Sequence, residues 1–305
     1  MNSNCFTEIE WASLRLPTGG EISLRALRVG KGLPRTVVVI GLHGDETAPL
    51  YVLEQMLRTC QIERITGTTD FVLTVNWLGL LSNRREFPIM HENVNRLFTN
   101  GGNETPARVL VNKLESFLRD SDLVIDLHNW DSPTTILGIH YDCGSTTVND
   151  RSIGVLAAFR CAYIWTPENN SDFIGTLGQR LASIPIAYAG IEFPPPWLID
   201  HAIIEDLSRR LFRVLSRTPA SEPRPPTGLR REIVSPDSGL LLPLKNPGDI
   251  VSANEPIADL RSVSSLKTLG RVLSPQAGML LCLASRRFVH SGETLGFVGI
   301  GTLES

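Results

Sequence analysis

The chain has 305 residues, 42% of them hydrophobic, so it is long enough for about two domains and can bury a large core. Its 29 basic and 32 acidic residues give a net charge of -3 at pH 7, which argues against a nucleic-acid or anionic-membrane partner, since both need a basic face. The first residues lack a leader pattern, no apolar run approaches the ~18 residues of a membrane span, and the five cysteines lack paired spacing. We therefore expect a cytoplasmic protein with reduced thiols.

From residue 36 to about residue 218 the sequence alternates apolar strands with amphipathic helices, a pattern typical of an α/β fold. A hairpin is expected around residues 17–20. Helices are predicted after Thr47, the expected N-cap, and over residues 106–118 and 197–215. Strands are predicted over residues 37–40, 71–75, 123–128, 162–165 and 186–193.

The composition then changes. Residues 219–227 are rich in proline and predict a semi-rigid linker between a first domain, residues 1–218, and a second one, residues 228–305. Within the second domain the segment SPDSGLL at Ser235 returns 39 residues later as SPQAGML at Ser274. Two similar halves predict a barrel-like β sandwich of the biotinyl- or lipoyl-carrier kind. Lys267 lies near the modified lysine of such carriers, but without their usual Met or Asp neighbours, so we predict an ordinary surface lysine.

Three residues predict a hydrolytic metal site. His43 and Glu46 follow the apolar run of residues 37–40, and His128 closes the apolar run of residues 123–127. In open α/β sheets ligands bind just outside the carboxyl ends of the strands, so these side chains are expected to converge. Two imidazoles and one carboxylate would hold one Zn²⁺ per chain and leave a fourth position for water. An H-x-x-E pair is weak evidence alone, and the distant histidine strengthens it.

Other polar residues suit amide hydrolysis beside such a metal. Asn93, Asn95 and Arg96 follow a strand and a loop, and an adjacent amide and guanidinium suit a substrate carboxylate. The alternative is a surface loop whose arginine pairs with a neighbouring acid. Arg85 is a candidate donor to the oxyanion that forms when a carbonyl is attacked, with Arg84 as the competing candidate.

Two acids complete the predicted site. Glu192 ends an otherwise apolar strand, where a carboxylate is costly unless it has a task or a partner, so we predict a general base and proton shuttle. Its alternative is a strand-end acid with a structural partner. Asp126 lies two positions before His128, on the same strand face, and is predicted to orient a metal-binding histidine through the ring nitrogen that does not touch the metal.

These motifs resemble the aspartoacylase and succinylglutamate desuccinylase family, a deacylase branch of the zinc-carboxypeptidase clan. The segment from His43 to Glu46 is similar to its H-G-x-E, Asn95-Arg96 to its N-R, Asp126-Leu127-His128 to its D-L-H, and Glu192 to its late catalytic glutamate. Residues 85–98 are most similar to the subgroup containing N-acetyl-diaminobutyrate deacetylase, whose pattern reads R-x-x-P-x-x-x-x-N-L-N-R-x-F. The resemblance covers nearly the whole chain. It implies a zinc-carboxypeptidase-like mixed sheet flanked by helices, one zinc, and a smaller C-terminal all-β domain bordering the active-site entrance.

Two segments depart from the subgroup. Asn129-Trp130-Asp131 follows His128 where a Thr or Ser and glycines are usual, and Phe193-Pro194 follows Glu192 where a small residue and a glycine are usual. Both segments are expected beside the pocket, so the acyl group and the amino acid stay open.

We predict a zinc-dependent amidohydrolase that removes the acyl group from an N-acylated amino acid or a similar small carboxylate. Two alternatives stay open: a metallocarboxypeptidase acting on short peptides, and a non-catalytic protein of the same fold that binds a small carboxylate. The sequence also leaves open whether the chain forms homo-oligomers.

Overall fold

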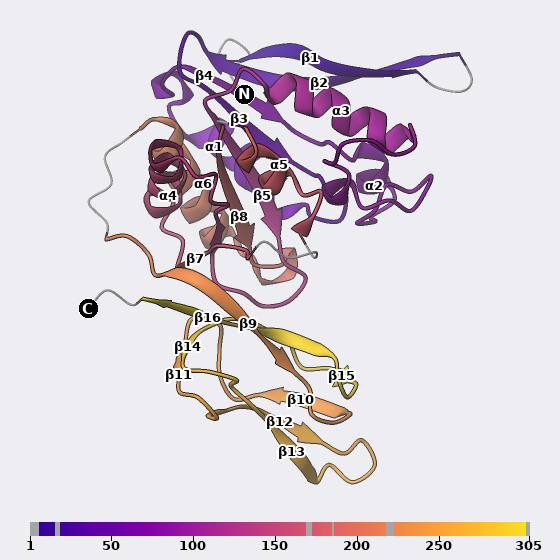
Figure 1. The fold of residues 1–305 in the computed structure, drawn as a ribbon, viewed down its shortest axis with the longest axis vertical. Coiled ribbons are helices and arrows are strands. Elements are labelled where there is room, and N and C mark those ends of the chain that lie inside the picture. Colours follow the sequence, from indigo (N-terminus) through magenta and orange to yellow (C-terminus); the bar gives the residue numbers. More distant parts are fainter. Residues whose placement is uncertain (1–5, 16–18, 169–172, 185, 218–222, 303–305) are drawn as a thin grey trace.

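A computed structural model describes residues 6–15, 19–168, 173–184, 186–217 and 223–302. Its main feature is a twelve-stranded mixed sheet with the order β1-β2-β4-β3-β5-β8-β6-β7-β9-β16-β14-β11 (Figure 1). A second, four-stranded sheet with the order β13-β12-β10-β15 belongs to the C-terminal part. No helix of the described chain is both long and apolar enough to span a membrane. The expected fold class, an α/β mixed sheet with a smaller C-terminal β part, is confirmed.

The central strands of the first part run parallel. β3 pairs with β4 and β5, and β5 pairs with β8, all in parallel, while β2 and β6 pair antiparallel with β4 and β8. β1 and β2 form the predicted hairpin, although residues 16–18 of its turn lie outside the described residues. The strands are β1 (Thr7–Arg15), β2 (Glu21–Gly30), β3 (Arg35–Ile40), β4 (Thr68–Val72), β5 (Leu123–Asn129), β6 (Leu137–Ile139), β7 (Tyr163–Trp165) and β8 (Ala187–Phe193).

Helices cover both faces of this sheet. Two hydrophobic clusters show the division: α1, α4 and α6 pack with Val38, Ile40 and Ile125 on one face, and α3 and α5 pack with Val37 and Val39 on the other. This alternation along β3 explains its continuous apolar run. The helices are α1 (Ala48–Thr59), α2 (Trp77–Leu81), α3 (Pro106–Leu118), α4 (Thr146–Ala158), α5 (Leu177–Ala182) and α6 (His201–Leu215), with short 3-10 turns η1 (Ile62–Arg64), η2 (Val94–Arg96) and η4 (Pro196–Leu198).

β4 and α6 begin three or more residues away from their predicted starts. β4 begins and ends three residues before the expected strand, because its first half is polar yet buried: Asp70 accepts hydrogen bonds from Arg28 at 2.6 Å and from Arg35 at 2.9 Å. A hydrophobicity pattern does not mark such residues as strand. α6 starts at His201 instead of residue 197, because the Asp200 side chain caps the helix by accepting from the backbone N–H of Ile203 at 2.9 Å.

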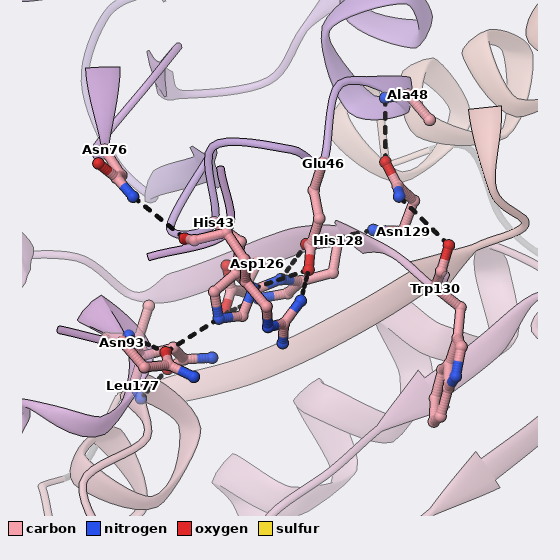
Figure 2. A network of polar contacts seen from close by, with 12 residues as sticks. His43, Glu46, Ala48, Asn76, Asn93, Asp126, His128, Asn129, Trp130 and Leu177 are labelled. Atoms are coloured by element: carbon pink, nitrogen blue, oxygen red, sulfur yellow. Dashed lines mark hydrogen bonds and ion pairs between the residues drawn. The ribbon is translucent and has the colours of Figure 1, made fainter. Parts of the chain in front are cut away.

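The expected cap of α1 is also different. Thr47 occupies the N-cap position, but its side chain makes no capping hydrogen bond. The first helical N–H, that of Ala48, instead donates to the side-chain oxygen of Asn129 at 3.1 Å (Figure 2). Because Asn129 ends β5, this contact ties the start of α1 to the strand that carries His128.

The C-terminal part continues the main sheet. β9 pairs in parallel with β7 and antiparallel with β16, so backbone hydrogen bonds cross the expected boundary at residue 228. The expected linker, residues 219–227, lies partly outside the described residues, and in its described part Pro226 accepts from the N–H of Ile164 at 2.8 Å. The strands are β9 (Thr227–Val234), β10 (Gly239–Pro243), β11 (Ile250–Val251), β12 (Pro256–Arg261), β13 (Thr268–Leu273), β14 (Gly278–Leu283), β15 (Phe288–Val289) and β16 (Thr294–Thr302).

The repeated segments have matching local structure. The buried hydroxyl of Ser235 donates to the carbonyl of Asp237 at 2.7 Å, and that of Ser274 donates to the carbonyl of Gln276 at 2.6 Å. The repeat therefore corresponds to two similar turns, each leading into a short strand. Lys267 is exposed in the turn between β12 and β13, as expected of a surface lysine.

Candidate metal and catalytic site

The three predicted metal ligands lie together at the carboxyl ends of β3 and β5. The Nδ1 atoms of His43 and His128 lie 2.7 and 2.6 Å from the two carboxylate oxygens of Glu46, and all three side chains are buried (Figure 2). One ligand atom from each residue fits within 4.8 Å of the others. The group is therefore compact enough to hold one metal ion.

Glycines place the first two ligands. Gly41 turns the chain out of β3 with a φ of 72°, a left-handed conformation that glycine adopts without strain. A Cβ at Gly44 would lie 2.1 Å from the backbone of Gly79, so only glycine allows this loop to pack against α2. His43 and Glu46 thereby point toward the end of β5.

In both histidines the Nε2 atom, which is the ring nitrogen that does not face Glu46, lies beside an oxygen atom. Nε2 of His43 lies 3.1 Å from the side-chain oxygen of Asn93, which also accepts from the backbone N–H of Asn95 at 3.0 Å and so acts as an acceptor. Nε2 of His128 lies 3.0 Å from Asp126. Each Nε2 is then the donor, and each Nδ1 presents its lone pair to Glu46. Two lone pairs facing a carboxylate repel one another unless a proton or a cation lies between them, which is the arrangement that a metal requires.

Without a cation, the charges of the site favour a proton between His128 and Glu46, in the position that a metal would take. Burial disfavours the charged form of Glu46, yet His43 and His128 hold its pKa well below the usual range. Burial also lowers the pKa of His43, whereas Asp126 and Glu46 outweigh burial and raise the pKa of His128. A carboxylate that stays charged beside a neutral imidazole is a suitable ligand set for Zn²⁺.

Asp126 is itself fixed from a second side. One of its oxygens, which contacts His128, also accepts from the hydroxyl of Tyr188 at 3.0 Å. Asp126 and His128 thus lie two residues apart on β5 with their side chains in contact, and Tyr188 on β8 supports the acid.

Glu192 faces the same space as the ligands. It is directly paired with His128 in the parallel register of β5 and β8, so the two side chains project from the same sheet face. Its carboxylate forms no hydrogen bond or ion pair with any residue that the structure describes. Burial, with Glu46 nearby, raises the pKa of Glu192 to about 7. A partnerless carboxylate with this pKa suits proton transfer near neutral pH.

Arg85 reaches the ligands, and its neighbour does not. A terminal nitrogen of Arg85 lies 2.6 Å from Glu46, and the side chain lines the cavity beside the ligand group. Arg84 is not among the residues that line this cavity. Of the two arginines, Arg85 is therefore the one placed to meet a bound carbonyl.

The other predicted substrate residues separate into two groups. Asn95 and Arg96 line the cavity, and Asn95 is held there because its side-chain oxygen accepts from the N–H of Leu177 at the start of α5, at 2.8 Å. Asn93 does not line the cavity and contacts His43 instead. The placement of Asn93 favours a role in orienting His43, a candidate metal ligand, over the expected contact with substrate.

The site opens into a cavity of about 390 Å³. Two segments were expected beside the pocket because their sequences depart from the N-acetyl-diaminobutyrate deacetylase subgroup. The first of them, Asn129-Trp130-Asp131, lines the cavity. Phe193 was expected beside the pocket but points away and stacks on Phe159 in the core, because Glu192 next to it takes the pocket face. Sequence reasoning missed several lining residues, whose only signal was a scatter of aromatic and polar types: Ile139, Tyr141, Trp165, Phe173, Thr176, Tyr188, Arg230 and Phe297.

Comparison with known proteins agrees with this geometry. A model of the succinylglutamate desuccinylase/aspartoacylase catalytic domain matches residues 32–216. The chain belongs to the succinylglutamate desuccinylase/aspartoacylase family. The match spans the strands and loops that carry all the residues discussed above except those from the C-terminal part. No curated protein matches the sequence.

Solved structures share the fold over nearly the whole chain. The product-bound ectoine utilization protein EutE (DoeB) from Ruegeria pomeroyi superposes with a TM-score of 0.80 at 16% identity, over 98% of this chain and 96% of that one. A succinylglutamate desuccinylase/aspartoacylase from Rhodobacter sphaeroides gives 0.78 at 18% identity, over 98% and 95%. An aspartoacylase family protein from Mesorhizobium loti gives 0.78 at 16%, over 99% and 97%. At these identities the likeness concerns the fold, C-terminal part included.

Proposed function

We propose that the protein is a zinc-dependent amidohydrolase that removes the acyl group from an N-acylated amino acid or a similar small carboxylate. The observation that carries this proposal is the pairing of a ligand group, His43, Glu46 and His128, with a partnerless acid, Glu192, in one cavity. Membership of a deacylase family supports it. A zinc ion held by the three ligands would supply a Lewis acid for the amide carbonyl and for water.

The protein's own residues then have distinct tasks. Glu192 takes a proton from the attacking water and delivers it to the nitrogen of the leaving amine, so that the C–N bond breaks to give a carboxylic acid and an amine. Arg85 donates hydrogen bonds to the oxygen that becomes negative as the carbonyl is attacked. Arg96, with Asn95, holds the substrate carboxylate through its planar fork. Asn93 and Asp126 keep the two histidines in the ligating tautomer.

The C-terminal part contributes to the shape of the site. Arg230 on β9 and Phe297 on β16 line the cavity. We propose that residues 228–305 border its entrance and act as a substrate-selecting unit. A cavity of about 390 Å³ that is lined in part by these strands favours small acyl-amino acids over the long peptides that a carboxypeptidase would take.

Two measurements test the proposal. Purified protein is expected to carry about one zinc per chain, and His128→Ala to lose most of it, because three ligands leave no redundancy. The hydrolysis screen covers acetyl, succinyl, formyl and γ-glutamyl amides of acidic, basic and neutral amino acids, and release of free amine by zinc-loaded protein is expected for at least one. Full zinc occupancy in the variant would refute the ligand assignment. A zinc-loaded protein that hydrolyses none of these amides would favour the carboxylate-binding alternative.

A further inference from the structure

A second cavity lies at the opposite end of the strands that carry the metal ligands. Its volume is about 260 Å³, and α4 and α6, which lie side by side on one face of the sheet, both line it (Figure 1). Thr36, near the start of β3, and Leu123, the first residue of β5, also line it. Leu123 comes five residues before His128, so at about 3.3 Å per residue the two lie roughly 16 Å apart. The second cavity is therefore separate from the catalytic site.

The lining combines buried apolar side chains with one unpartnered hydroxyl. Leu123, Val214 and Leu215 are all buried. Thr36 is only 6% exposed, and its hydroxyl forms no hydrogen bond with any residue that the structure describes. A hydroxyl in such a place is costly without a partner, so Thr36 favours a ligand that brings a polar atom to it.

Gly154 leaves the cavity open on the side of α4. It occupies the interior of this helix, where glycine is less favourable than every residue except proline. A Cβ at Gly154 would have no heavy atom within 4 Å, so no close approach of neighbouring atoms requires glycine. Because Gly154 lines the cavity, the effect of the missing side chain is to keep this space free.

The charged side chains of the lining are mainly basic. Arg151 on α4, Arg213 in the last turn of α6 and Arg217 just after that helix all line the cavity. Among the described residues that line it, Asp150 is the only acid, and Asp150 lies 3.4 Å from Arg224, which does not line the cavity. The cavity therefore carries an excess of positive charge, which favours an anion.

Two of the arginines have donors to spare. The guanidinium of Arg217 forms no ion pair or hydrogen bond with any residue in the described part of the chain. Arg151 donates to the backbone carbonyl of Asp122 at 3.2 Å and lies 3.8 Å from its carboxylate. A guanidinium has five N–H donors, so these contacts position Arg151 and leave donors for a ligand.

We infer that this cavity is a second ligand site, which binds a small organic acid through a carboxylate or phosphate group. The planar guanidinium groups match either oxyanion, and the hydroxyl of Thr36 adds a neutral partner. The buried apolar side chains suit the carbon skeleton of such an acid. The alternative role for Arg213 and Arg217 is to interact with the negative end of the α6 dipole, which requires no ligand.

Direct binding tests this inference without any catalytic readout. Isothermal titration at low salt, in a buffer without phosphate, compares three probes of similar size: benzoate, phenyl phosphate and benzamide, the uncharged analogue of benzoate. At least one of the two anions is expected to bind about tenfold or more tightly than benzamide, the span expected of a charge-assisted contact. The two anions also distinguish a carboxylate site from a phosphate site.

A substitution that fills the cavity locates the bound anion. Gly154→Leu is expected to weaken anion binding at least tenfold, because its side chain takes the free space. Leucine is a better helix former than glycine, so the Tm is expected to stay the same or to rise. Arg151→Gln combined with Arg217→Gln is expected to reduce the preference for the anion over benzamide to about twofold or less.

Two controls exclude other locations. Arg209 also lies on α6, but it is 3.7 Å from Glu205 and does not line the cavity, so Arg209→Gln is expected to leave binding unchanged. Arg96→Lys alters the catalytic cavity and is expected to have no effect either.

Three results would overturn the inference. A wild-type protein that binds neither anion more tightly than benzamide would leave the arginines with their interaction at the helix end. A folded Gly154→Leu variant that binds the anion as tightly as the wild type would place the anion elsewhere. Binding that Arg96→Lys weakens and Gly154→Leu leaves unchanged would place the anion in the catalytic cavity. None of these results depends on hydrolysis, so the outcome is separable from that of the proposed function.

Discussion

The substitution Glu192→Gln separates proton transfer from metal binding. Glutamine keeps the size of the side chain and removes its ability to accept a proton. Because Glu192 has no hydrogen bond to His43, Glu46 or His128, the ligand group should keep its geometry, and zinc content is expected to stay near that of the unmodified protein. Turnover is expected to fall by roughly 10²–10⁴, the usual contribution of general acid–base catalysis, which corresponds to about 2.7–5.4 kcal/mol in activation free energy.

The pH profile gives a second, independent readout. A base must be deprotonated to act, so activity is expected to fall about tenfold per pH unit below the pKa of Glu192. That pKa is raised to about 7 by burial, and a bound cation would lower it, so the acid limb of the loaded enzyme should lie at or below pH 7. Glu192→Gln is expected to abolish this limb together with most of the turnover.

The assay combines metal analysis by mass spectrometry with initial rates from pH 5 to pH 9 on the substrate found in the screen. Glu86→Gln is the matched control, because Glu86 is a half-exposed acid that does not line the cavity. It should leave both turnover and profile unchanged. Near-normal turnover of Glu192→Gln with zinc bound would refute the assigned role, and loss of zinc would show that Glu192 supports the ligand group.

Two further substitutions probe the surroundings of the metal and the carboxylate clamp. Asp126→Asn is expected to weaken zinc binding by about 10–100-fold, because the Nε2 of His128 loses its charged acceptor. Tyr188→Phe is expected to weaken zinc binding less, because it leaves the contact between Asp126 and His128 in place. Equal zinc affinity in Asp126→Asn and the unmodified protein would contradict this role of Asp126. Arg96→Lys is expected to raise KM strongly for an acid substrate and hardly at all for its uncharged amide analogue, because lysine lacks the planar guanidinium that matches a carboxylate. An equal rise in KM for both substrates would indicate that Arg96 supports the fold instead of binding the carboxylate.

Local patterns in the sequence were enough to predict that the candidate metal ligands lie together. His43 and His128 each follow a continuous apolar run, and buried parallel strands are the structures that produce such runs. Because ligands gather at the carboxyl ends of these strands, position in the sequence translated directly into position in space. The α/β class, the extent of α3 and the repeat in the C-terminal part could be predicted for the same reason, since each depends on short-range periodicity or similarity.

The tertiary structure decided which neighbours each polar residue meets. Asn93 contacts His43 across 50 positions of sequence, and Asn129, instead of Thr47, caps α1 from another strand. Arg230 and Phe297 reach the cavity only because β9 adds to the edge of β7, a pairing between distant segments. No local signal encodes such contacts, because they depend on sheet order and register, and those are set by the packing of the whole chain.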